Sequence, residues 1–238
     1  MPSPVHVEGS IKPGRVMQEF EKRFIELSRQ AGALRFGEFV LKSGRVSPYF
    51  FNAGEFCSGA RLAALAACYA DKIVASELEF DGLFGPAYKG IPLVAATAMA
   101  LAQRHDRDYP YTFNRKEPKL HGEGGALVGA PLQGRILIVD DVITAGTAVR
   151  ETLALLESAP GVTVCGVLVG LDRQEVSPDA GDKHLSAVSA LAAEAGVPVH
   201  SIVRFEHLLD YLSNVRPDIQ DSPKILKLMQ TYRQEYGA

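Results

Sequence analysis

The most constraining feature of the sequence is a pair of short, almost entirely apolar runs in its second half, residues 136–139 and 164–169. A strand has this composition when helices cover both faces of its sheet, which is typical of parallel sheets. From residue 82 onward, segments with helical spacing alternate with short apolar strands. We expect strands at 82–85, 111–114, 135–140, 162–171 and 197–203, with helices at 90–103, 147–158 and 185–195. The sequence therefore predicts an α/β fold with a mainly parallel sheet flanked by helices.

The remaining parts of the chain contain no linker long enough to separate two domains, so we expect a single domain over 1–238. Residues 1–15 are polar and rich in proline and glycine, and we expect a flexible extension there. The other predicted elements are a helix from Met17 to a stop at Gly32, strands at 34–41 and 46–53 around a turn at 43–45, a helix from an N-cap at Ser58 to about residue 76, and helices at 205–212 and 223–236.

Composition excludes several classes of protein. The formal net charge is −3, which does not favour a nucleic-acid-binding domain. The cysteines Cys57, Cys68 and Cys165 have neither the pairing of a disulfide scaffold nor the spacing of a zinc site. The apolar stretch 91–102 is far shorter than the ~20 residues of a membrane-spanning helix, and the N-terminus lacks the apolar centre of a signal peptide. We therefore expect a cytoplasmic protein that binds neither nucleic acid nor membranes.

The strongest functional signal is the segment 136–148, in which an apolar strand ends in Asp140 and Asp141. A turn of small residues follows, and then a helix begins. Small residues let backbone N–H groups approach an anion closely, and the helix N-terminus adds partial positive charge, so a phosphate fits at 144–148. The two carboxylates can accept hydrogen bonds from ribose hydroxyls at the carboxyl end of a strand. An ordinary strand end followed by an N-cap is the alternative interpretation.

This segment resembles the phosphoribosyl pyrophosphate signature of the type I phosphoribosyltransferases. The resemblance implies that Asp140 and Asp141 hold the ribose 2′- and 3′-hydroxyls and that the turn holds the 5′-phosphate. The residues that it implies for this turn and its flank are Val142, Ile143, Thr144, Ala145, Gly146, Thr147 and Ala148.

Residues 41–52 resemble the N-terminal motif of the orotate-specific branch of this family. Phe50 and Phe51 supply flat apolar surface for a pyrimidine ring, and Lys42 supplies a cation nearby. By the same resemblance Lys42 contacts phosphoribosyl pyrophosphate, and Thr144 contacts orotate as well as phosphate. The alternative is a hydrophobic hairpin with a lysine that faces solvent.

Residues 85–90 follow a strand and open a helix, which suits a second anion, with Lys89 adding charge. They resemble the family's pyrophosphate loop, and the resemblance assigns Tyr88 and Lys89 to phosphoribosyl pyrophosphate. Without the resemblance, a strand–helix turn with an exposed lysine is equally consistent with these residues.

Residues 115–122 lie in a glycine-rich, basic stretch that we expect to be without regular structure from 115 to 125. They resemble the family's mobile catalytic lid, whose basic groups neutralise the departing pyrophosphate while closure excludes water. A solvated surface loop is the alternative. The implied contacts to phosphoribosyl pyrophosphate are Arg115, Lys116, Lys119 and His121, and the implied catalytic residues are Lys119, His121, Asp140 and Asp141.

Residues 171–175 end another strand, and Arg173 has the planar geometry that binds carboxylates through two hydrogen bonds. Orotate carries a carboxylate, and the resemblance makes Arg173 its partner. A structural salt bridge is the competing interpretation.

Taken as a whole, the resemblance implies transfer of a phosphoribosyl group to orotate in pyrimidine synthesis, by an α/β domain with a small N-terminal hood mainly from residues 33–57. It also implies Mg²⁺, held through substrate and water without direct protein ligands, and a homodimer whose lids are shared across the interface. Two alternatives stay open. One is a related transferase for another base, and the other is a regulatory protein that binds phosphoribosyl pyrophosphate as an effector.

Overall fold

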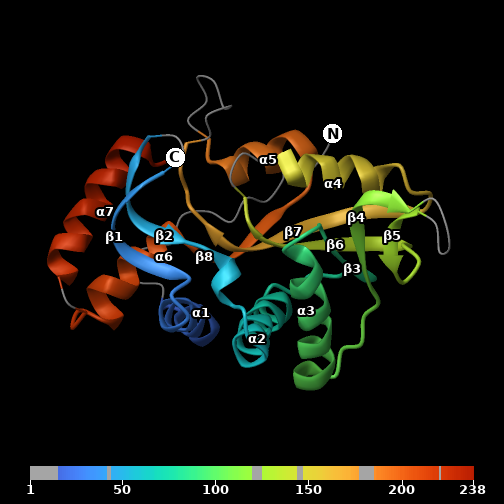
Figure 1. Cartoon of the computed structure of the whole chain (residues 1–238), viewed down its shortest axis with the longest axis horizontal. Coiled ribbons are helices and arrows are strands. Elements are labelled where there is room, and N and C mark those ends of the chain that lie inside the picture. The colour runs from blue at the N-terminus through green and yellow to red at the C-terminus, as the bar shows by residue number, and fades with distance from the viewer. Residues whose placement is uncertain (1–15, 42–43, 120–124, 144–146, 177–184, 220) are drawn as a thin grey trace.

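The computed structural model describes residues 16–41, 44–119, 125–143, 147–176, 185–219 and 221–238. Its centre is a six-stranded sheet with the order β5-β4-β3-β6-β7-β8 (Figure 1). Neighbouring strands are parallel except for β4 and β5, which are antiparallel. The strands are β3 (Gly82–Gly85), β4 (Tyr111–Lys119), β5 (Gly125–Gly129), β6 (Gly134–Val142), β7 (Val162–Asp172) and β8 (Val199–Arg204). The predicted α/β fold with a mainly parallel sheet is confirmed.

Helices cover both faces of this sheet. Figure 1 shows α1 (Glu19–Gln30), α2 (Gly59–Ala75) and α3 (Gly90–His105) on one face, with α4 (Thr147–Glu157) and α5 (Ala187–Ala195) on the other. The predicted N-cap of α2 is confirmed, because the Ser58 hydroxyl accepts a hydrogen bond from the backbone N–H of Arg61.

Two apolar cores explain why β6 is apolar at every position in its middle. Leu137 and Val139 belong to the core beneath α1, α2 and α3, whereas Ile136 and Ile138 belong to the core beneath α4 and α5. Successive strand residues point to opposite faces, so a strand between two cores needs apolar residues without alternation.

A second, two-stranded sheet lies beside the first. It is the antiparallel hairpin of β1 (Leu34–Val40) and β2 (Val46–Phe51), followed by a short 3₁₀ turn, η1 (Ala53–Glu55). The C-terminal helices α6 (Phe205–Asp210) and α7 (Ser222–Tyr236), joined through the π-helical turn η2 (Tyr211–Val215), lie next to the hairpin (Figure 1). Tyr49 of β2 contacts Phe205, and Phe205 contacts Tyr232 of α7, with ring centroids 5.5 and 6.4 Å apart. This packing ties the hairpin to the end of the chain.

One predicted element is wrong. We expected the chain from 115 to 125 to lack regular structure, but β4 continues to Lys119 and β5 begins at Gly125. The two strands pair as a hairpin, with Asn114 opposite Leu127 and Lys119 opposite Gly125, and the register is irregular between these pairs. The sequence hides this hairpin because it forms the edge of the sheet, with β5 as the outermost strand, and charged residues are common at sheet edges.

Candidate active site

The candidate residues gather where β3, β6 and β7 end. Asp140 and Asp141 lie near the C-terminal end of β6. The loop 86–89 follows β3, and Arg173 directly follows β7. These strands are parallel neighbours, so their carboxyl ends meet at one edge of the sheet. Open α/β sheets bind ligands at this edge, where the chain leaves the strands.

Asp140 and Asp141 are both buried, with 8% of each residue exposed. The backbone N–H of Asp141 donates to Asp140 Oδ1 at 2.8 Å, and the Tyr69 hydroxyl of α2 donates to the Asp140 carbonyl at 2.9 Å. Burial, followed by the charge of Asp141, raises the pKa of the Asp140 carboxyl to about 7. The backbone of the pair is therefore fixed by these bonds, and the Asp140 carboxyl ionises near neutral pH.

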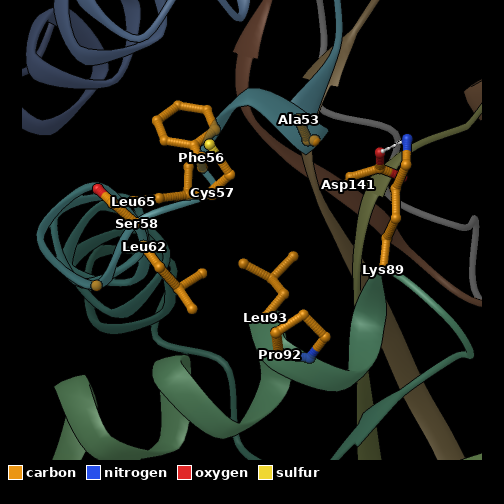
Figure 2. A pocket seen from close by; sticks show the side chains of 12 residues that line it. Ala53, Phe56, Cys57, Ser58, Leu62, Leu65, Lys89, Pro92, Leu93 and Asp141 are labelled. Atoms are coloured by element: carbon orange, nitrogen blue, oxygen red, sulfur yellow. Dashed lines mark hydrogen bonds and ion pairs between the residues drawn. The ribbon is translucent and has the colours of Figure 1, made fainter.

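Lys89 is the cation that faces this acidic pair. Its Nζ lies 2.7 Å from Asp141 Oδ2, while more than half of the lysine side chain is exposed. The lysine immediately precedes α3, and its side chain extends away from the helix start to reach Asp141 (Figure 2). An exposed lysine that is nevertheless anchored to a buried carboxylate can move to an anion that binds beside it.

The loop before Lys89 is fixed by backbone contacts. The Ala87 N–H donates to the Asn114 side chain at 2.8 Å, and the Gly90 N–H donates to the Pro86 carbonyl at 2.9 Å. The Ala87–Tyr88 peptide bond is cis. Tyr88 is 68% exposed, and Lys116 Nζ of β4 lies 5.3 Å from the centre of its ring. Basic side chains of β4 thus lie next to the loop.

Two cavities open at this edge of the sheet. The larger, about 410 Å³, lies between the starts of α2 and α3, and the Lys89–Asp141 pair forms its polar end (Figure 2). The smaller, about 270 Å³, lies between residues 86–87, residues 114–116 of β4 and the α4 residues Glu151 and Thr152. Arg115 contributes to the smaller cavity, and its buried NH1 group has no hydrogen-bond partner among the described residues. A free buried donor of this kind is suited to an anionic ligand.

Arg173 is held by its neighbour Glu175. Its Nε donates to Glu175 Oε1 at 2.9 Å, and its NH2 lies 2.8 Å from the same oxygen without the geometry of a hydrogen bond. The guanidinium also stacks on Tyr49, with its central carbon 5.1 Å from the ring centre. A salt bridge is therefore present, as the competing interpretation expected, but it engages only one edge of the guanidinium.

Phe50 and Phe51 are separated by the strand that carries them. Adjacent residues of a strand point to opposite faces. Phe51 stacks with Phe24 of α1 at 6.1 Å, whereas Phe50 contacts Phe39 at 5.7 Å and lies beneath Arg35. The two rings cannot press their faces against the same side of one pyrimidine.

Several predicted site residues lie outside the described residues, namely Lys42, His121, Thr144, Ala145 and Gly146. Others lie in described elements without a described side chain, namely Lys119 in β4 and Thr147 and Ala148 in α4. Val142 ends β6, and Ile143 after it is buried.

Sequence reasoning missed the residues that hold the site together. Tyr69 and Glu175 bond to the site residues Asp140 and Arg173, and Asn114 bonds to the backbone of the loop that carries Lys89. Tyr69 and Asn114 belong to no recognisable motif, and Glu175 ends the segment 171–175 without a role assigned to it from the sequence. Only Glu175 lies close in sequence to its partner, and a charge of opposite sign two residues from Arg173 was the one available signal.

No group of three His, Cys, Asp or Glu side chains that could hold a metal ion occurs in the part of the chain that the structure describes. Across the same residues, no helix is both long enough and apolar enough to cross a membrane.

Comparison with known proteins agrees with this geometry. The family model described as the phosphoribosyl transferase domain matches residues 54–202. A protein of Saccharophagus degradans named orotate phosphoribosyltransferase is 54% identical over 93% of this chain and 99% of its own length. The Pseudomonas aeruginosa protein of the same name is 53% identical over 93% of this chain and its entire length.

A solved structure adds similarity in three dimensions. The crystal structure of orotate phosphoribosyltransferase from Francisella tularensis has 42% sequence identity and a TM-score of 0.79, covering 90% of this chain and 99% of that one. Sequence motifs, fold and relatives over nearly full length thus lead to one assignment: this chain belongs to the orotate phosphoribosyltransferase family of the type I phosphoribosyltransferases.

Proposed function

We propose that this chain transfers the 5-phosphoribosyl group of phosphoribosyl pyrophosphate to orotate, giving orotidine 5′-monophosphate and pyrophosphate in pyrimidine nucleotide synthesis. One observation carries the proposal: three features meet at the same edge of the sheet. They are a buried acidic pair, a lysine paired with it, and an arginine of which only one edge contacts Glu175. Each of these matches one part of the substrates, namely the ribose hydroxyls, the diphosphate and the orotate carboxylate.

The ribose and its 5′-phosphate fit the end of β6. Asp140 and Asp141 accept hydrogen bonds from the 2′- and 3′-hydroxyls, and the buried backbone contacts of the pair hold the acceptors in place. The residues from Thr144 to Ala148 bind the 5′-phosphate, since they precede or begin α4 and a helix N-terminus favours an anion.

The pyrophosphate leaves toward the basic groups. The loop after β3 contributes Tyr88 and Lys89, and the adjacent strand β4 contributes Arg115 and Lys116. Lys119 and His121 follow further along the chain. The reaction breaks the bond between the anomeric carbon and a pyrophosphate oxygen, and a ring nitrogen of orotate bonds to that carbon. Fixed cations stabilise the charge that develops on the leaving group, so no protein nucleophile is required.

Mg²⁺ suits this chemistry because it neutralises the diphosphate. The donors at the site fit an ion held mainly through substrate and water: Asp141 is already paired with Lys89, and Asp140 has a pKa of about 7. These carboxylates would therefore position the ribose rather than serve as a complete set of metal ligands.

Orotate fits between Arg173 and the hairpin. The edge of the guanidinium that Glu175 leaves unengaged can bind the carboxylate. Only one of the rings of Phe50 and Phe51 can face the pyrimidine, because they point to opposite faces of β2. Phe51 packs against Phe24, so Phe50 is the ring with fewer core contacts.

A homodimer in the cytoplasm completes the proposal, with lid residues contributed across the interface. It is supported by two exposed side chains with large apolar groups: Tyr88 in the loop before α3 is 68% exposed, and Met99 in the second half of α3 is 59% exposed. Exposed apolar surface is a feature of protein–protein contacts.

The direct test is a spectrophotometric assay of orotate consumption with phosphoribosyl pyrophosphate and Mg²⁺. Turnover with orotate, and none with uracil or a purine base, supports the proposal. Turnover only with another base would favour a related transferase. Binding of phosphoribosyl pyrophosphate without turnover of any base would favour a regulatory protein.

Replacing Arg173 with Ala tests the orotate site. We expect weaker orotate binding by roughly 1.5–3 kcal/mol, the contribution of a hydrogen bond to a charged group, with little change for phosphoribosyl pyrophosphate. Calorimetry measures each ligand separately. Arg216→Ala is the control, because Arg216 forms an exposed pair with Asp218 away from the site. An unchanged orotate affinity in Arg173→Ala would contradict the assigned role.

A further inference from the structure

The environment of Arg173 contains more than the substrate contact requires. Arg173 and Glu175 are both largely buried, with 17% and 16% of their side chains exposed. Glu175 Oε1 accepts two hydrogen bonds, from Arg173 Nε at 2.9 Å and from the Tyr49 hydroxyl at 3.3 Å. Tyr49 therefore contacts the pair twice, through its hydroxyl and through the ring face beneath the guanidinium.

The backbone that carries Glu175 is fixed from outside the sheet. Glu175 forms a β-bridge with Gly237, the Val176 N–H donates to the Tyr236 carbonyl at 2.8 Å, and the Ala238 N–H donates to the Gln174 carbonyl at 3.0 Å. The side chain of Gln174 accepts from the Glu206 N–H at 3.0 Å. The segment after β7 is thus held by residues 236–238 and by α6.

From these contacts we infer that Glu175 is a positioning residue for Arg173: it fixes one edge of the guanidinium by hydrogen bonding and leaves the other N–H groups for the carboxylate of the pyrimidine. This inference rests on the proposed function. Arginine has many rotamers, and fixing one of them before the substrate arrives removes an entropy penalty from binding. Glu175 also supplies the counter-charge without which a buried guanidinium is unfavourable.

The inference predicts that orotate binding depends more on the length of the side chain at position 175 than on its charge. Glu175→Asp keeps the charge but shortens the side chain by one methylene, so the carboxylate no longer reaches Nε without moving the arginine. Glu175→Gln keeps the length and an acceptor oxygen for both Arg173 and Tyr49, and loses the charge. The two variants therefore form a matched pair that separates geometry from electrostatics.

Steady-state kinetics of the full chain, with orotate and phosphoribosyl pyrophosphate varied in turn, test the inference. For Glu175→Asp we expect a rise of about tenfold or more in the KM for orotate, comparable with losing a hydrogen bond to a charged group. Its kcat and its KM for phosphoribosyl pyrophosphate should stay within about twofold. Glu175→Gln keeps an acceptor at the same reach but loses the counter-charge, so its KM for orotate should rise several-fold less than that of Glu175→Asp, while its melting temperature falls.

Three outcomes would overturn the inference. They are an unchanged KM for orotate in Glu175→Asp, a loss in Glu175→Gln as large as in Glu175→Asp, and a KM rise for both substrates alike. Arg173→Ala, measured in parallel, separates this inference from the proposed function. If Arg173→Ala loses orotate binding while Glu175→Asp does not, only the positioning role of Glu175 fails. If the parent does not consume orotate, the proposed function itself fails.

Discussion

Asp140 is the residue whose chemistry depends most on where the fold puts it. Burial beside Asp141 raises its pKa to about 7 from the ordinary aspartate value of 3.8. Between these two values the folded chain holds a proton that the unfolded chain has released. Stability therefore falls as the pH rises from about 4 to about 7, by the linkage between proton binding and folding. The ionised form, which accepts hydrogen bonds more strongly, is the form that suits ribose hydroxyls.

Replacing Asp140 with Asn should remove this titration. We expect Asp140→Asn to have a higher melting temperature than the parent at pH 8, and the difference to shrink toward pH 5, where the parent carboxyl is largely protonated. In the parent, affinity for phosphoribosyl pyrophosphate should fall as the pH drops below about 7. Thermal melting and calorimetry across this range measure both effects. The exposed Asp108→Asn is the control, and a melting difference independent of pH would contradict the assignment.

Sequence could identify the reacting residues but not the ones that hold them. The acidic pair and Arg173 stand in motifs, so their types and spacing are readable. The bond from Tyr69 to the Asp140 carbonyl joins residues 71 positions apart, and the bond from Ala87 to Asn114 joins residues 27 apart. Such contacts depend on how α2 and β4 pack, and no local pattern contains that information.

At the scale of elements, the junction of β3 and α3 controls where Lys89 lies. A Cβ added to Gly85 would come within 2.2 Å of the Gly90 carbonyl oxygen, and one added to Gly90 within 2.6 Å of Pro86 Cδ. The strand end and the helix start are therefore in direct backbone contact. This contact closes the loop 86–89 tightly and sets the position of its lysine.

Gly85→Ala should disturb this junction. We expect a loss of about 1–3 kcal/mol in the free energy of unfolding, as for other overpacked sites. The KM for phosphoribosyl pyrophosphate should also rise, because Lys89 moves with the loop. Urea unfolding and steady-state kinetics provide the two measurements. Gly59→Ala is the matched control, since nothing lies within 4 Å of a Cβ at that position, and equal behaviour of the two variants would disprove the argument.

The elements themselves were largely predictable, with one instructive failure. Buried strands such as β6 and β7 have distinctive composition because both faces are covered. The β4–β5 hairpin does not, since its outer strand lies at the sheet edge and its residues 126–128 form too short an apolar run to stand out. Edge strands take their stability from pairing rather than from burial, and pairing leaves a weaker trace in sequence.

At the scale of the whole molecule, the sheet between two cores followed from composition, but the attachment of the hairpin to α7 did not. Tyr49 and Tyr232 are 183 residues apart in sequence and are connected through Phe205. The sequence predicts the hairpin and the helix separately. Their contact depends on the tertiary arrangement, which sets the relation between the orotate-facing hairpin and Arg173.

The proposed shared lid makes a prediction about the assembly. One variant carries Lys119→Ala and His121→Ala, and a second carries Asp140→Asn and Asp141→Asn. Each homodimer should be nearly inactive. In a mixed dimer, one site combines both defects and the other is intact, and random exchange makes about half of the dimers mixed. About a quarter of the parent activity should therefore return.

Subunit exchange must be verified by mass spectrometry before activity is compared. If mixed dimers form and activity stays at the level of the separate variants, each lid serves its own subunit and the shared-site proposal is wrong. A mixture of each variant with itself is the control for dilution and handling.

The line of rings from Tyr49 through Phe205 to Tyr232 and Tyr236 has an optical consequence. The chain contains eight tyrosines and no tryptophan, so tyrosine dominates its near-ultraviolet spectrum. Three of the eight stand in this line, and Tyr49 lies directly beneath Arg173. Near-ultraviolet circular dichroism reports the fixed packing of aromatic side chains. The unlabelled protein thus carries a built-in chromophore, Tyr49, directly at the place where orotate is proposed to bind.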